Sequence, residues 1–130
     1  MRKREAEFGL LFRHWIKKNG KQSGPYELKF APDGKSMKFT ELKEEQANFL
    51  LAAKSSKGVL IRVIGGSGEP DYAYYRNSPA WVVIRYAKFF VIIDIEDFIF
   101  ERDRGGKRRS LTGERAREIA HTYQKIGDKR

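Results

Sequence analysis

Two runs of β-branched and aromatic residues, separated by only two residues, constrain the fold more than any other feature of this sequence. The runs are Trp81–Tyr86 and Phe89–Asp94. Side chains of this kind favour the pleated, half-buried surface of a sheet, and so short a gap favours a hairpin. The two runs therefore predict a pair of adjacent strands at the heart of a β-sheet.

The rest of the chain alternates helical and strand patterns. Phe8, Leu11, Phe12 and Trp15 share one face at helical spacing. Further strands are expected at 26–30, 58–64 and 72–76, and helices at 4–18, 40–55 (with Thr40 as N-cap), 96–101 and 112–125. This order predicts an α/β fold: one domain over residues 1–130, with a mixed central β-sheet flanked by helices and the basic loop 102–109 and the last helix as an extension.

Charge narrows the class of partner. The chain has 27 Lys and Arg against 17 Asp and Glu, a formal net charge of +10. A surplus of this size on a small domain favours a polyanion, above all nucleic acid, over a ribosome-like or merely soluble basic protein. The chain has no cysteine and no apolar run long enough to cross a membrane, so we expect an intracellular, cytoplasmic protein without membrane contact.

The strand at 26–30 carries the pattern with the most chemical content. Tyr26, Leu28 and Phe30 point to one side of a strand, so Glu27 and Lys29 point to the other. A carboxylate beside an ammonium suits phosphodiester hydrolysis, in which a carboxylate-held divalent cation stabilises the negative charge of the transition state. The alternative is an ordinary strand with a solvated charged face.

Acid-x-Lys also occurs at Asp33-Gly34-Lys35 and at Glu41-Leu42-Lys43. Asp33 belongs to a turn signal, and Glu41 opens a predicted helix. Neither alternates with large apolar residues on a strand, so context favours the first occurrence.

Three further polar residues are candidates for the same site. Glu7 lies at the margin of the apolar face of the first helix, and Gln46 falls on the apolar stripe of the second. Asp71 follows Pro70 and opens an aromatic strand, a position suited to a metal ligand, for which Glu69 competes. Each also has a plain structural interpretation, as a surface carboxylate, a buried amide with satisfied hydrogen bonds or a turn residue.

Basic residues near two elements are candidates to bind nucleic-acid phosphates. One group, in the basic loop, is Arg102, Arg104, Lys107, Arg108 and Arg109; the other, after the first helix, is Lys18 and Lys21. The alternative for both is a solvated surface.

With these residues in view, the chain resembles archaeal-type Holliday junction resolvases of the PD-(D/E)xK nuclease superfamily, particularly small phage-encoded members. The resemblance covers most of the chain. It rests on Glu7 in the first helix, Tyr26-Glu27-Leu28-Lys29, the helical segment Phe39-Thr40-Glu41-Leu42-Lys43-Glu44-Glu45-Gln46, Gly58-Val59-Leu60, Trp81-Val82-Val83-Ile84 and Phe90-Val91-Ile92-Ile93-Asp94.

The resemblance implies a PD-(D/E)xK endonuclease-like fold, a homodimer and a Mg²⁺-dependent endodeoxyribonuclease, with Mn²⁺ as a substitute, that resolves four-way DNA junctions by paired nicks. It implies Glu7, Glu27 and Asp71 as metal ligands, with Lys29 and Gln46 as further catalytic residues. The family usually has an Asp on a strand before the Glu-x-Lys strand, whereas residues 19–26 of this chain contain no acid. Phage relatives place that Asp later, after a Pro, which Asp71 matches; Ser23, in the shortened interval, is a candidate DNA contact.

Two other functions stay open at this point. One is a nickase or flap nuclease of the same fold, and the other is a nucleic-acid-binding module without catalysis.

Overall fold

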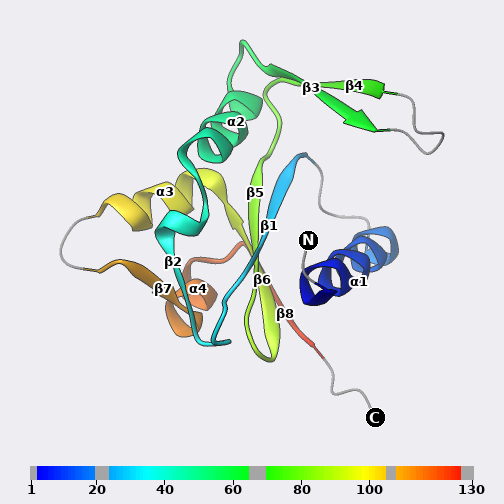
Figure 1. Cartoon of the computed structure of the whole chain (residues 1–130). Helices are drawn as coiled ribbons and strands as arrows, with labels where there is room; N and C mark the ends of the chain where they lie inside the picture. Colours follow the sequence, from blue (N-terminus) through cyan, green and yellow to red (C-terminus); the bar gives the residue numbers. More distant parts are fainter. Residues whose placement is uncertain (1–2, 20–23, 65–69, 105–107, 127–130) are drawn as a thin grey trace.

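The structure is a computed structural model that describes residues 3–19, 24–64, 70–104 and 108–126 of the 130. For 3–6, 19, 61–64 and 70–71 it describes the backbone alone. Figure 1 shows a central sheet with α1 on one side and the other helices on the opposite side. Within the described ranges, no helix is both long and apolar enough to cross a membrane.

A four-stranded mixed sheet forms the centre of the molecule. Its order is β1-β5-β6-β8, with β1 parallel to β5 and the other neighbours antiparallel. The strands are β1 (Tyr26–Phe30), β5 (Trp81–Arg85), β6 (Phe89–Asp94) and β8 (Thr122–Lys125). The predicted hairpin is confirmed as β5 and β6, closed by a 2.8 Å bond from Tyr86 N–H to the Phe89 carbonyl. The α/β class and the helix-flanked mixed sheet are confirmed with it.

Helix α1 (Lys3–Asn19) covers one face of this sheet, as its apolar stripe predicts. Phe8 and Phe12 are buried there against Val83 and Phe90. The rings of Phe12 and Phe90 meet edge to face with centroids 5.4 Å apart, a favourable geometry for aromatic pairs. Tyr26, Leu28 and Phe30 of β1 pack against these aromatic side chains, so Glu27 and Lys29 lie on the other face of the sheet.

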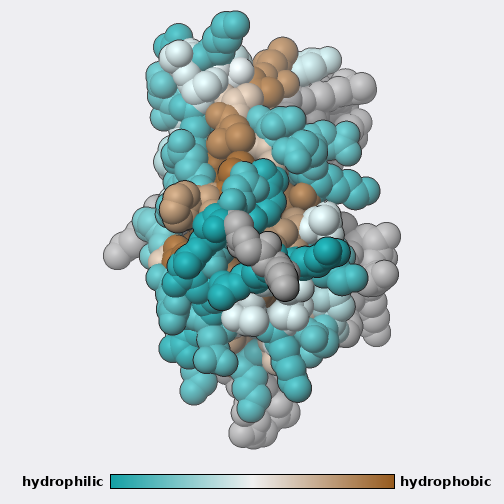
Figure 2. Space-filling model, turned by 90° about the vertical axis from the view of Figure 1, so that its left-hand side faces the viewer, coloured by the Kyte–Doolittle hydropathy of each residue, from teal (hydrophilic) through white to brown (hydrophobic). Residues whose placement is uncertain are grey.

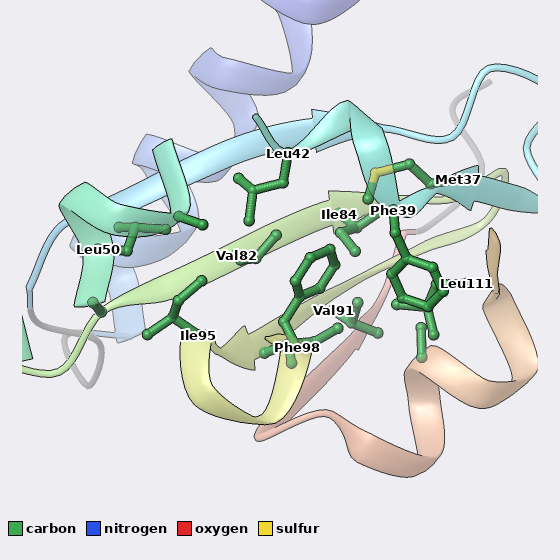
Figure 3. Close-up of a cluster of buried hydrophobic side chains, with 14 of the residues drawn as sticks. Met37, Phe39, Leu42, Leu50, Val82, Ile84, Val91, Ile95, Phe98 and Leu111 are labelled. Atoms are coloured by element: carbon green, nitrogen blue, oxygen red, sulfur yellow. The ribbon is translucent and has the colours of Figure 1, made fainter. Parts of the chain in front are cut away.

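Helices α2 (Glu44–Lys54) and α3 (Ile95–Asp103) cover the opposite face. Figure 3 shows the larger core beneath them, where Leu50 and Phe98 meet Val82 and Val91 of the sheet. All four side chains are fully buried. Residues of β5 and β6 are buried on both faces of the sheet, which explains why the sequence of each strand is a continuous apolar run.

Two small sheets complete the fold. Strand β2 (Ser36–Lys38) pairs antiparallel with β7 (Ser110–Thr112), and β3 (Val59–Ile64) pairs antiparallel with β4 (Pro70–Tyr75). In Figure 1 the β3–β4 hairpin extends away from the central sheet, whereas β2 and β7 lie beside α3 and α4. The strands predicted at 58–64 and 72–76 are confirmed in β3 and β4.

The start of the second helix differs from the prediction. Residues Phe39–Glu41 form a short 3₁₀ turn, η1, and α2 begins only at Glu44, so Thr40 is not its N-cap. Phe39 and Leu42 are both buried, which holds this stretch as a separate turn against the core. The first turn of α2 is closed instead by Gln46, whose Oε1 accepts the Lys43 N–H at 3.0 Å.

The last predicted helix, 112–125, was too long. Helix α4 (Gly113–Ile119) starts as predicted, with Thr112 Oγ1 accepting the Arg115 N–H, but the chain then continues as strand β8. Strand β8 pairs with β6, which satisfies backbone groups along the β6 edge. The basic loop 102–109 is also shorter than predicted, because Arg102 belongs to the last turn of α3.

Candidate functional site

The Glu27–Lys29 pair lies on the face of β1 that is turned toward α2. In the sheet, Glu27 aligns with Val82 and Lys29 with Ile84 of β5. Val82 and Ile84 are fully buried, whereas Glu27 and Lys29 are half-buried. The difference arises because β1 is an edge strand of the described sheet. Its polar side chains therefore reach solvent at the border of the large core.

Gln46 joins α2 to this strand. Its Nε2 donates a hydrogen bond to Glu27 Oε1 at 3.3 Å, while its Oε1 accepts the Lys43 backbone N–H at 3.0 Å. A backbone N–H can only donate and a carboxylate can only accept, so the amide has one satisfactory orientation. Gln46 thus connects the beginning of α2 to the β1 carboxylate.

Electrostatics set Glu27 apart from an ordinary surface acid. Burial raises the pKa of the Glu27 carboxyl above its usual range, and the nearby positive charge of Lys29 offsets part of that rise. Within the described part of the chain, neither residue forms an ion pair. The result is a partly desolvated carboxylate, bonded to the Gln46 amide, beside a half-buried ammonium, with no ion pair for either among the described residues.

Glu7 is not joined to this group. It is exposed on α1, which packs on the other face of the sheet, and no hydrogen bond or ion pair links it to the described residues. Any approach of Glu7 to Glu27 has to pass around the edge of β1.

Asp71 lies on the β3–β4 hairpin, opposite Val63, and its side chain is outside the described residues. Burial raises the pKa of Tyr26 of β1, and Tyr75, at the other end of β4, adds to that rise. Asp71 lies four residue steps from Tyr75 along β4, which corresponds to about 13 Å. Glu69, its competitor, lies outside the described residues. Among the described side chains, no three Asp, Glu or His residues gather closely enough to hold a metal ion.

The predicted phosphate contacts have different outcomes. Lys18 is exposed in the last turn of α1. Lys21, Ser23 and Lys107 lie outside the described residues. The four arginines predicted in the basic loop are described, and Arg102, Arg104 and Arg108 are in ion pairs.

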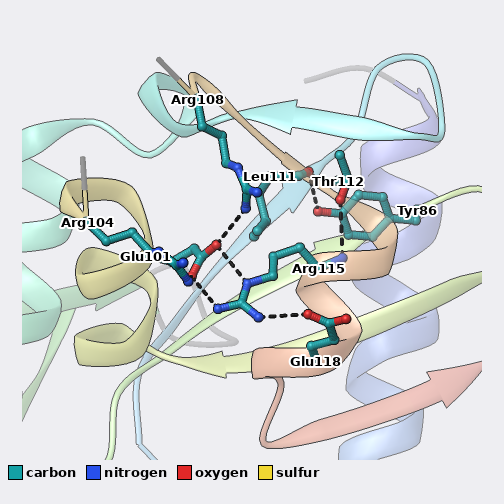
Figure 4. A network of polar contacts seen from close by, with 8 residues as sticks. All are labelled: Tyr86, Glu101, Arg104, Arg108, Leu111, Thr112, Arg115 and Glu118. Atoms are coloured by element: carbon teal, nitrogen blue, oxygen red, sulfur yellow. Dashed lines mark hydrogen bonds and ion pairs between the residues drawn. The ribbon is translucent and has the colours of Figure 1, made fainter. Parts of the chain in front are cut away.

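Glu101 organises part of the basic loop, and it is the one buried charged side chain among the described residues. Figure 4 shows its carboxylate among three arginines from different elements. It accepts bonds from Arg115 Nε at 2.9 Å and Nη2 at 3.1 Å, and pairs with Arg108 at 2.9 Å and Arg104 at 3.4 Å. The hydrogen bond from Arg115 is the main cause that lowers the pKa of Glu101. This network ties α3, the end of the basic loop and α4 together.

A groove of about 640 Å³ lies where η1 and the start of α2 face the end of α3 and residues 108–109. Its charged lining residues are Lys38, Lys43, Glu44, Arg102, Asp103, Arg108 and Arg109. The sequence gives no sign of Lys38 and Lys43 as partners of the basic loop, because more than 50 residues separate the two walls. Figure 2 shows this side of the molecule, where hydrophilic surface surrounds a band of hydrophobic patches.

Comparison with models of protein families, with curated proteins and with solved structures finds no match to this chain.

Proposed function

We propose that this chain is a metal-dependent DNA endonuclease of the PD-(D/E)xK kind that cuts four-way junctions. The observation that carries the proposal is the group formed by Glu27, Lys29 and Gln46: a carboxylate and an ammonium on one strand face, with a helical glutamine bonded to the carboxylate. The formal charge of +10 supports a nucleic-acid substrate.

A divalent cation suits the chemistry of Glu27. Mg²⁺ takes oxygen ligands, commonly one or two carboxylates together with water and phosphate oxygens. Glu27 is a partly buried carboxylate with no ion-pair partner in the described part of the chain, so its charge is available to a cation. When bound, the cation would stabilise negative charge on the phosphoryl oxygens and acidify a water. We propose Glu7 and Asp71 as the further ligands, with Mn²⁺ as a substitute metal; Glu7 would have to reach the cation around the edge of β1, since α1 packs on the other face of the sheet.

The protein side chains have separate tasks in this proposal. Gln46 holds the Glu27 carboxylate in a fixed position through its hydrogen bond. Lys29 supplies positive charge next to it, where it can stabilise the phosphoryl group during attack by water. We further propose that the protein works as an intracellular homodimer, because two equivalent active sites can nick a two-fold symmetric junction on opposing strands.

The experiment is cleavage of a labelled synthetic four-way junction with Mg²⁺. Paired nicks are expected from the natural chain, and Glu27→Gln should abolish cutting while leaving junction binding intact. Glu41→Gln is the matched control, because it removes the acid of another acid-x-Lys motif on the exposed η1 turn and should leave cleavage unchanged. Cleavage by Glu27→Gln at the natural rate would refute the proposed site.

The assignment of Glu7 and Asp71 has its own test. Glu7→Gln and Asp71→Asn should each weaken Mn²⁺ binding measured by calorimetry, in addition to reducing cleavage. Unchanged Mn²⁺ binding in either variant removes that residue from the ligand set.

A second candidate is a DNA-binding module without catalysis, favoured by the basic groove, which includes neither Glu27 nor Lys29. It predicts salt-sensitive binding without metal-dependent cleavage. A panel of duplex, flap and four-way substrates separates junction resolution from nicking or flap cutting by the same fold.

A further inference from the structure

We propose that the groove between η1 and the end of α3 binds the phosphate backbone of a DNA strand and so determines how DNA lies across the Glu27 site. The choice of DNA rests on the proposed function. The anion-binding property of the groove rests on its own charges.

The lining of the groove has a surplus of positive charge, with five basic residues against two acids. Both acidic lining residues pair with the same arginine: Arg102 contacts Asp103 at 2.8 Å and Glu44 at 3.8 Å. Lys38, Lys43 and Arg109 form no ion pair with any described residue. Arg102, Asp103 and Glu44 together keep one net negative charge, so the three cations from the two walls leave the groove with a positive surplus, which a polyanion can neutralise.

Both walls are held in place by the fold. Strand β2 pairs Lys38 with Ser110 of β7, and the Phe39 N–H donates to the Arg109 carbonyl at 3.0 Å. Arg108 is anchored to the buried Glu101 carboxylate. The basic groups thus lie on paired backbone and not on a free loop, so less conformational entropy is lost when they bind phosphate.

The groove is linked directly to the Glu27 site through Lys43. Lys43 lines the groove, and its backbone N–H donates to Gln46, which in turn donates to Glu27. A strand held at Lys43 is therefore connected to the β1 carboxylate through one intervening side chain, that of Gln46. Contacts to phosphate fix register without reading sequence, which suits a protein that recognises the shape of its substrate.

The test measures DNA binding without metal, so that it does not depend on cleavage. Fluorescence anisotropy with a labelled four-way junction, in EDTA and over a series of salt concentrations, gives both affinity and the number of phosphates neutralised. Lys38→Ala/Lys43→Ala should lower the slope of log K against log salt by about 2 and weaken binding at least about tenfold at 0.1 M salt. Lys125→Ala/Lys88→Ala is the control for loss of two charges, since both lysines are exposed outside the groove.

The proposal is overturned if the groove variant has an unchanged salt slope, or if the control variant loses as much DNA affinity as the groove variant. It is also overturned if the groove variant loses binding to poly-glutamate but binds DNA normally, because the groove would then be a site for an acidic protein. Thermal melting verifies that both variants fold. The binding result and the cleavage result are independent of each other. If the protein does not cleave DNA but the groove variant binds DNA more weakly, the groove still binds phosphate and the proposed nuclease activity is wrong. If the protein cleaves junctions but the groove variant binds DNA as well as the natural chain, the nuclease proposal stands and the groove proposal is wrong.

Discussion

Removing the charge of Glu101 should cost this protein a large share of its stability. The Glu101 side chain is 1% exposed and accepts four bonds from three arginines. In Glu101→Gln one carboxylate oxygen becomes an amide group, which places a donor among guanidinium donors. Breaking a buried ion pair typically costs about 3–5 kcal/mol.

The arginines themselves reduce this cost. Their side chains are 30% to 52% exposed, so water can solvate them again when the carboxylate charge is lost. We therefore expect a loss of about 2–3 kcal/mol in the free energy of unfolding. For a chain of this length that corresponds to a fall of roughly 10 °C in Tm.

Urea unfolding followed by circular dichroism measures this loss, and Glu118→Gln is the matched control. Glu118 pairs with the same Arg115, at 2.7 Å, but its side chain is 63% exposed. Its replacement should cost about 0.5 kcal/mol or less. Equal losses in the two variants, or a loss below about 1 kcal/mol for Glu101→Gln, would refute the claim that burial gives this network its strength.

The effect should also depend on pH in a defined direction. Because the Arg115 hydrogen bond lowers the pKa of Glu101 in the folded state, the carboxylate contributes stability above its unfolded pKa of about 4.3. That contribution is lost as pH falls through the lower, folded pKa. The difference between Glu101→Gln and the natural chain should therefore be complete at neutral pH and shrink below about pH 4. A difference that does not change with pH would mean that packing, not charge, is responsible.

Two other substitutions test the site and the core. Burial raises the pKa of Glu27, so the stability that this residue contributes is present below its unfolded pKa and is lost as pH rises through its folded pKa. Glu27→Gln should therefore have a higher Tm than the natural chain at pH 7 to 8. This difference in Tm should vanish below about pH 4. A lower Tm for Glu27→Gln at pH 8 would contradict the desolvation argument. Phe98→Ala should cost about 3–5 kcal/mol in urea unfolding, because Phe98 is fully buried and packs edge to face on Phe39. The neighbouring Phe100→Ala should cost about 0.5 kcal/mol or less, since Phe100 is 70% exposed; similar losses would place the core elsewhere.

Local periodicity was sufficient to predict much of this fold. The two-residue period of β1 separates Tyr26, Leu28 and Phe30 from Glu27 and Lys29, and the structure has the two sets on opposite faces. The helical stripe of α1 and the apolar runs of β5 and β6 were identified in the same way. Each of these features depends on burial of side chains only a few residues apart, which a sequence displays directly.

Features that join distant segments required the tertiary structure. Residues 122–125 continue a helical stretch in sequence but form a strand, because the exposed edge of β6 offers backbone partners. The bond from Gln46 to Glu27 depends on how α2 crosses the sheet, and neither residue identifies the other in the sequence.

The basic groove and the Glu101 network show the same division. Composition alone determined that this protein is strongly cationic. Which of the described cations have no ion pair was decided only when the fold brought Glu101 among three arginines and set Lys38 and Lys43 opposite residues 108–109. Charge is a property of each residue, whereas pairing depends on distances that only the packed chain defines.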